Sequence, residues 1–186
     1  MSQNDTIVKP NPGPLGLLGF GMTTVLLNLH NAGIIELSIV IAAMGFALGG
    51  AAQIIAGIFE FRNGNTFSGT AFVAYGFFWW SLVAIWTNPA GVMNAADPVS
   101  MGYYLLLWGL FTGAMFIGTL THNRATQVVF GTLTILFLLL ALGDFTGNAT
   151  ITTIAGYVGI LCGASAMYNS FGQIINKEHN KTIFPL

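Results

Sequence analysis

The sequence predicts an all-α membrane protein whose chain crosses the bilayer six times. Of its 186 residues, 54% are hydrophobic and only 6% are charged, whereas about 25% of the residues in an ordinary soluble domain are charged. Five Lys/Arg and six Asp/Glu residues cannot cover a surface that faces water. The apolar runs are long and unbroken, which excludes the alternating pattern of a membrane β-barrel. A net charge of −1 argues against nucleic acid as a partner, so the expected partner of this surface is the lipid bilayer.

Six stretches have the length of a transmembrane helix, which needs about 20 mostly apolar residues. They are Pro14–Asn31, Ile34–Phe61, Phe67–Thr87, Val99–Leu120, Ala125–Gly143 and Ile151–Ile175. Short polar or Gly- and Pro-containing breaks separate them, including the turn signal Asn63-Gly64. The predicted organisation is therefore an N-terminal tail over residues 1–13, a six-helix membrane domain over 14–175 and a C-terminal tail over 176–186.

The basic residues predict the orientation of the chain. With six spans, all five fall on one side of the membrane: Lys9, Arg62, Arg124, Lys177 and Lys181. The acidic residues Glu36, Asp97 and Asp144 fall on the other side. Because Lys and Arg are retained on the cytoplasmic side, we expect a multi-pass protein of the cell membrane with both termini in the cytoplasm.

Small residues and tryptophans predict how the helices pack. The sequence contains three GxxxG pairs, at Gly45/Gly49, Gly109/Gly113 and Gly159/Gly163. Such pairs let helix backbones approach closely in lipid, either within one chain or between the subunits of an oligomer. The four tryptophans are expected to face lipid or the membrane interface.

Neutral polar side chains within the spans are candidates for a transport pathway. They are Thr23, Thr24, Asn28, Asn31, Gln53 and Tyr75, together with the acidic residue Glu60 near the end of its span. Many Ser and Thr residues in membrane helices instead bond to a backbone carbonyl or to a neighbouring helix. For the amides of Asn28 and Gln53, lining of a pore and bonding between helices are equally plausible, because an amide in hydrocarbon needs several partners. No charged residue falls in the middle of a span, so the spans carry no obvious charge relay.

The first span begins with a distinctive segment, Asn11-Pro-Gly-Pro-Leu-Gly-Leu17. Proline suits the first turn of a helix, where its missing N–H costs nothing. If the amides from Leu15 and Gly16 onward are unpaired, this helix start favours a small anion. The alternative is a plain helix start that Asn11 caps.

The same segment resembles the signature of the acetate uptake transporter family, which includes bacterial succinate–acetate permeases. The resemblance continues through Gly19–Asn31, Gly49–Gln53 and Gly64–Phe67, and through Leu107-Trp-Gly109 and Leu161–Ala166 later in the chain. It implies six helices per protomer, a homo-hexameric ring and a pathway for acetate in each protomer, and for succinate in some relatives. It also implies an apolar constriction formed by Phe20, Tyr75 and Leu133.

Two transport mechanisms follow, and an enzyme is disfavoured. The resemblance favours proton-coupled uptake of acetate and other small carboxylates, and the alternative is a passive anion channel of the same architecture. An enzyme or a metal site would need a cluster of His, Cys, Asp or Glu, but His30, His122 and His179 lie in separate segments and Cys162 is the single cysteine. We therefore expect no cofactor, no metal and no catalytic residue.

Overall fold

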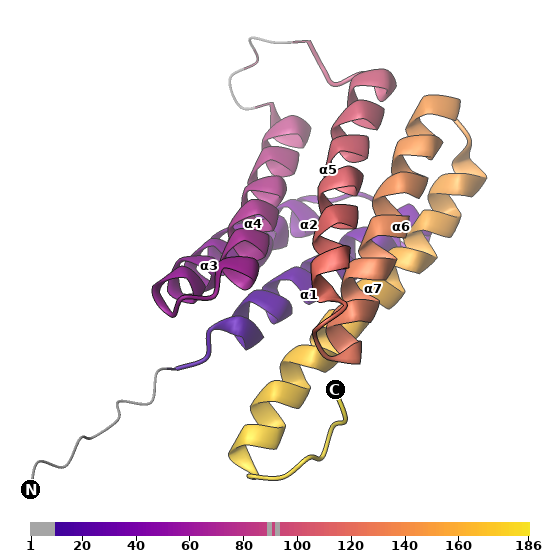
Figure 1. Ribbon diagram of the computed structural model, residues 1–186. Coiled ribbons are helices and arrows are strands. Elements are labelled where there is room, and N and C mark those ends of the chain that lie inside the picture. The colour runs from indigo at the N-terminus through magenta and orange to yellow at the C-terminus, as the bar shows by residue number, and fades with distance from the viewer. Residues whose placement is uncertain (1–9, 89–90, 92–93) are drawn as a thin grey trace, which may run out of the picture.

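The protein is a bundle of helical rods, and the all-α prediction is confirmed. The computed structural model describes residues 10–88, 91 and 94–186, and these residues contain six rods and no strand (Figure 1). The rods are α1 (Gly13–Asn31), a continuous rod of α2 (Ile39–Met44), η1 (Gly45–Ala52) and α3 (Gln53–Arg62), then α4 (Thr66–Thr87), α5 (Pro98–Thr119), α6 (Arg124–Thr146) and α7 (Ala149–Glu178). Five of these rods are long and apolar enough to cross a membrane. The remaining one, α1, has 19 residues, and its Asn28, His30 and Asn31 make it more polar.

Polar side chains fix where four helices begin. An N-cap oxygen accepts a hydrogen bond from an amide that has no partner inside the helix. The caps are Asn65 for α4, Asp97 for α5, Asn123 for α6 and Asn148 for α7. At Asp97, the hydroxyl of Ser100 donates across 2.5 Å and its backbone N–H across 3.0 Å. These bonds hold the pKa of the Asp97 carboxyl below its ordinary value.

Three predicted helix ends were wrong by three residues or more, and one of them is the end of α6, which lies at Thr146 and not at Gly143. The second rod begins at Ile39 and not at Ile34, because the backbone amides of Ile34 and Ile35 both bond to the carbonyl of Leu29, at 2.9 and 3.3 Å. Ser38 then takes an extended conformation and starts the new helix. The last rod continues to Glu178, three residues beyond the predicted end at Ile175. Lys9 and most of the predicted N-terminal tail lie outside the described residues.

The second rod changes its winding in the middle. Its segment η1 (Gly45–Ala52) is a π-helix, in which each amide bonds to the carbonyl five residues back. Gly49 and Gly50 bring this segment close to α4: a Cβ atom on Gly49 would lie 2.7 Å from the Trp79 ring, and one on Gly50 would lie 2.0 Å from Trp80. Glycine is therefore required where the π-helix meets α4.

The rods form an arc that side chains close. In this order, α4 packs on the rod of η1 and α3, that rod packs on α1, α1 on α7, α7 on α6, and α6 on α5. Between α4 and α5 the link is made by side chains: the Tyr75 hydroxyl donates to Thr112 Oγ1 at 3.0 Å, and the hydroxyl oxygens of Ser81 and Tyr104 lie 2.6 Å apart. The interior of the arc is thus filled by side chains from several helices.

The GxxxG pairs serve packing within the chain. A Cβ on Gly163 would lie 2.7 Å from the Gly21 carbonyl of α1, and one on Gly109 would lie 3.1 Å from Leu138 of α6. The prediction that the tryptophans face lipid or the interface was wrong for Trp79, which is only 2% exposed. Gly45 and Gly49 leave the space that its indole ring occupies.

The alternation of the rods places one set of turns at each end of the bundle. The start of α1, the α3–α4 turn, the α5–α6 turn and the C-terminus lie at the lower end in Figure 1. The end of α4, the start of α5 and the α6–α7 connection lie at the upper end. Arg62, Arg124 and Lys177 therefore share one end, as the charge pattern predicted.

Candidate functional site

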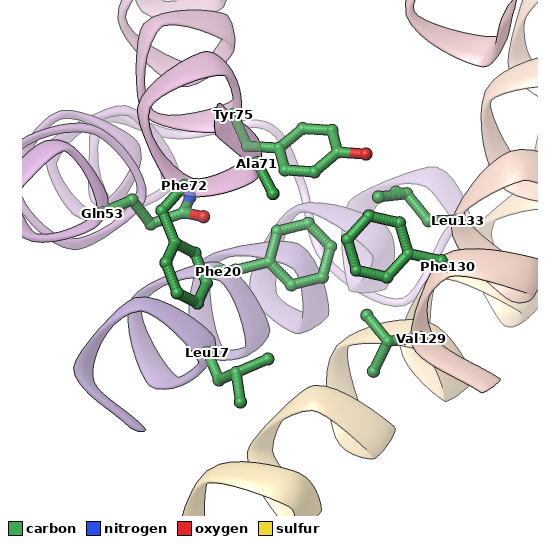
Figure 2. Close-up of a pocket in the computed structure, with 9 residues that line it drawn as sticks. All are labelled: Leu17, Phe20, Gln53, Ala71, Phe72, Tyr75, Val129, Phe130 and Leu133. Atoms are coloured by element: carbon green, nitrogen blue, oxygen red, sulfur yellow. The ribbon is translucent and has the colours of Figure 1, made fainter. Parts of the chain in front are cut away.

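A small apolar chamber lies inside the arc, and we call it the constriction chamber. It has a volume of about 20 Å³, which is about the space that one water molecule needs. Its lining comes from α1, α3, α4 and α6: Leu17, Phe20, Gln53, Ala71, Phe72, Tyr75, Val129, Phe130 and Leu133 (Figure 2). In this conformation the side chains leave room for one water-sized group, so a larger solute passes only when they move apart.

The three residues of the predicted constriction meet in this chamber. Phe20 of α1, Tyr75 of α4 and Leu133 of α6 are 6%, 3% and 2% exposed. The ring centroids of Phe20 and Tyr75 are 5.9 Å apart, and Figure 2 shows Phe20 pointing toward Phe130 of α6. Because the Tyr75 hydroxyl donates to Thr112, and Thr112 in turn donates to the carbonyl of Trp108 at 2.7 Å, the tyrosine presents its ring and not its O–H to the chamber.

Gln53 is the second polar side chain that lines the chamber. It is 0% exposed, and its Nε2 donates to the carbonyl of Gly49 at 2.7 Å. Its Oε1 is also buried and has no hydrogen-bond partner among the described residues. A buried acceptor without a donor is unfavourable, so this oxygen indicates a missing partner.

A larger polar cavity adjoins the chamber, and we call it the vestibule. Its volume is about 330 Å³. Leu17, Ala71, Phe72 and Phe130 line both the vestibule and the chamber, so the two spaces share a wall of four residues. The polar lining consists of Asn11, Glu60, Asn65, Ser68, His122, Asn123, Thr126 and Gln173. The vestibule therefore lies at the end of the bundle that holds the basic residues.

The start of α1 is already occupied by groups of the chain itself. The prediction that the amides of Leu15 and Gly16 are unpaired was wrong, because both donate to the carbonyl of Pro12, at 3.1 and 3.3 Å. The amide of Gly13 donates to Asn11 Oδ1 at 3.0 Å, although the N-cap position of α1 is Pro12 and not Asn11. A Cβ on Gly13 would lie 3.3 Å from Glu60 Oε1. The Glu60 carboxyl thus lies at the positive end of the helix dipole, where a bound anion was expected.

The remaining predicted pathway residues lie apart from the chamber and the vestibule. Leu15 lines a separate cavity between α1 and the end of α7, and Gly16 abuts the ring of Phe72. The Thr23 hydroxyl donates to the Gly19 carbonyl at 2.8 Å, and Thr24 is 3% exposed.

Asn28 and Asn31 form a hydrogen-bonded pair near the other end of α1. Asn31 Nδ2 donates to Asn28 Oδ1 at 3.0 Å, and Asn28 Nδ2 donates to the Thr24 carbonyl at 2.8 Å. The Asn28 side chain lies against Gly159 of α7. Both the nitrogen and the oxygen of the Asn28 amide are thus hydrogen-bonded within the bundle.

Sequence reasoning missed much of the lining. Phe72, Val129 and Phe130 gave no signal, because apolar residues in an apolar helix look alike whichever way they face. Asn123 and Gln173 could have been found, since amides are uncommon in or beside these spans. In the described part of the chain, no three His, Cys, Asp or Glu residues lie close enough to hold a metal ion.

Comparisons with known proteins agree with this architecture over nearly the whole chain. The succinate-acetate/proton symporter SatP of Escherichia coli strain K12 is 52% identical over 177 residues, which are 95% of this chain and 94% of that protein. Acetate permease A of Emericella nidulans is 32% identical over 95% of this chain and 65% of its own length. A solved structure of the bacterial acetate channel SatP superposes with a TM-score of 0.94 and 51% identity, covering 96% of this chain and 99% of that one.

A family model matches nearly the full sequence as well. It describes the GPR1/FUN34/yaaH family, and its match spans residues 3–186. The chain therefore belongs to the GPR1/FUN34/yaaH family.

Proposed function

We propose that this protein transports acetate, and also succinate and other small carboxylates, across the cell membrane by proton-coupled uptake. The observation that carries the proposal is a polar vestibule that ends at an apolar constriction, in a chain 52% identical to a succinate-acetate/proton symporter along almost its full length.

The chemistry of the two spaces suits a small carboxylic acid. The vestibule offers neutral amide and hydroxyl groups such as Asn11, Ser68 and Gln173. Such groups bind a carboxylate weakly enough to release it, which transport requires. Beyond them, Phe20, Tyr75 and Leu133 form an apolar gate that fits a methyl group. These residues, with Glu60 and Gln53, are the pathway residues that we propose first. Leu15, Gly16, Thr23, Thr24, Asn28 and Asn31 stay predictions for the rest of the pathway.

We further propose that both termini are cytoplasmic and that the vestibule opens to the cytoplasm. The shared end of Arg62, Arg124 and Lys177 supports this orientation. Residues 14–175 then form the membrane domain, and residues 1–13 and 176–186 form the tails. A homo-hexameric ring is consistent with α5, which exposes Tyr103, Leu107, Leu110 and Ile117 by 60–69% and so offers an apolar face to lipid or to a neighbouring subunit.

A passive anion channel is the second candidate. The described spans hold no charged side chain near their middle that could relay protons, and the superposed relative is called an acetate channel. The same vestibule and gate would then conduct acetate without a stoichiometric proton.

Uptake of radiolabelled acetate into liposomes that contain the purified protein tests the proposal. Proton-coupled uptake predicts accumulation when the lumen is more alkaline than the outside. Uptake that ignores the pH gradient and follows an imposed membrane potential would refute the symport and support the channel. No uptake above that of protein-free liposomes would refute both mechanisms. Single-channel currents in acetate provide the independent check on the channel.

A further inference from the structure

We infer that the acid crosses the constriction chamber in its undissociated form, and that its O–H donates a hydrogen bond to Gln53 Oε1. This inference rests on the proposed function, because it names the chemical form in which the acid passes the gate. It starts from a buried side-chain oxygen of the chamber lining that has no donor among the described residues.

The orientation of the Gln53 amide follows from its surroundings. Nε2 lies 2.7 Å from the Gly49 carbonyl oxygen, and only the amide nitrogen can donate to that acceptor. A flipped amide would place two acceptor oxygens at that distance. The Gly49 carbonyl therefore fixes Oε1 as the free atom of the amide, and Gln53 lines the chamber beside the Phe72 ring (Figure 2).

The rest of the lining offers no uncommitted hydroxyl to an anion. The Tyr75 hydroxyl donates to Thr112, and the other lining residues are Leu, Phe, Ala and Val. A carboxylate in this chamber would lose its water and meet an amide oxygen, which carries partial negative charge. An unpaired ion in an apolar site is far more costly than a neutral hydroxyl with a partner.

The undissociated acid removes both difficulties at once. It carries no net charge, and its O–H is the donor that Oε1 lacks. Before the chamber, acetate combines with one proton of the bulk solution to form acetic acid, and on the far side the acid releases that proton into the solution there. One acetate and one proton therefore cross together with no net charge, and no side chain of the protein needs to titrate.

The stoichiometry of the unmodified protein provides the first test. Liposomes with an imposed potassium diffusion potential are loaded with a lumenal pH dye, and protein-free liposomes correct for acid that crosses the lipid. We expect one proton to enter with each acetate and the rate to be independent of the potential. Uptake that carries charge would overturn this inference and leave acetate transport standing, whereas absent uptake would overturn the proposed function as well.

The variant Gln53→Met tests the named atom, because it keeps the length of the side chain and replaces the amide with a weak acceptor. Loss of one such bond predicts a five- to tenfold lower rate of acetate uptake. Thr134→Val is the matched control, since its hydroxyl bonds to the Phe130 carbonyl of its own helix at 2.8 Å and it does not line the chamber. An unchanged rate in Gln53→Met would assign Oε1 to a resident water and overturn the inference.

Two competitors test the inference without any variant, in case Gln53→Met does not fold. Acetamide is neutral, has the shape of acetic acid and carries N–H donors, so it should inhibit acetate uptake. Trifluoroacetate has a similar shape but stays ionised, so it should compete only in the vestibule and should not enter the liposomes through the protein. Protein-dependent entry of trifluoroacetate, followed by fluorine NMR, would show that the gate accepts the anion, and the inference would be wrong.

Discussion

Truncation of Phe20 to alanine should widen the gate and admit longer acids. Phe20 is 6% exposed, and the chamber beside it holds only about 20 Å³. Loss of a buried phenyl ring opens on the order of 100 Å³, which is the space that about three water molecules occupy in the liquid. Butyrate has two more methylenes than acetate, and each buried methylene is worth about 0.8 kcal/mol. The butyrate-to-acetate uptake ratio should therefore rise about fifteenfold.

The same truncation destabilises the fold, so the assay needs a control variant whose free energy of unfolding falls by a similar amount. A cavity of about 100 Å³ at about 24 cal/mol per Å³ costs roughly 2.4 kcal/mol, within a total of about 3–5 kcal/mol for Phe→Ala. Phe137→Ala is the control, because Phe137 is 3% exposed in the same core and does not line the chamber. Uptake of both acids is measured in liposomes with equal amounts of folded protein. A folded Phe20→Ala variant with the size preference of the unmodified protein would refute the role of Phe20 in the gate.

Three further predictions concern stability. Gly159→Ala should lower the free energy of unfolding by about 1–3 kcal/mol in a denaturant titration, because its Cβ would lie 2.1 Å from the Asn28 side chain. Gly113→Ala is the control: the nearest atom to its Cβ would lie at 3.6 Å, so its free energy of unfolding should be nearly unchanged. In the C-terminal segment, the backbone amides of Ile183 and Phe184 donate to Asn176 Oδ1 at 2.7 and 2.9 Å. Asn176→Ala should therefore release this segment, and limited proteolysis should cut it faster. An unchanged cleavage rate would contradict this role. Folding lowers the pKa of Asp97 from 3.8, so the charged carboxylate stabilises the protein above that pH. The melting temperature of the unmodified protein should therefore exceed that of Asp97→Asn, and this difference should shrink as the pH falls through the folded-state pKa. A difference that is independent of pH would be inconsistent with this assignment.

The helices could be predicted from the sequence because hydrophobic length and polar breaks are local properties. The exceptions were set by contacts between segments. The start at Ile39 depends on amides that bond back to Leu29, and neither residue signals this bond by its type. Trp79 was expected at the lipid or interface because tryptophan favours those places, but the glycines of a neighbouring helix make room for it inside.

The candidate site was likewise predictable only in part. Phe20, Tyr75 and Leu133 followed from a family resemblance, and the structure brings all three into one chamber. Gln53 followed from its type, because an amide in an apolar span needs partners, but only the structure separates its bonded nitrogen from its free oxygen. The pairing of Leu15 and Gly16 with Pro12 was missed because backbone turns of this kind leave no mark in the side chains.

The π-helix of the second rod determines where that rod tolerates the loss of a residue. Gln53 follows directly after η1, and Gly49, which fixes its amide, lies within η1. Deletion of one residue between Gly45 and Ala52 would let this segment return to α-helical winding. A π-helix has more residues per turn than an α-helix, so the lost residue and the tighter winding would largely offset each other, and α3 would keep its orientation. In the α-helical parts of the rod nothing offsets such a loss, because an α-helix turns by about 100° per residue. The π-helix is therefore a stretch in which this rod can lose a residue while Gln53 still reaches the chamber.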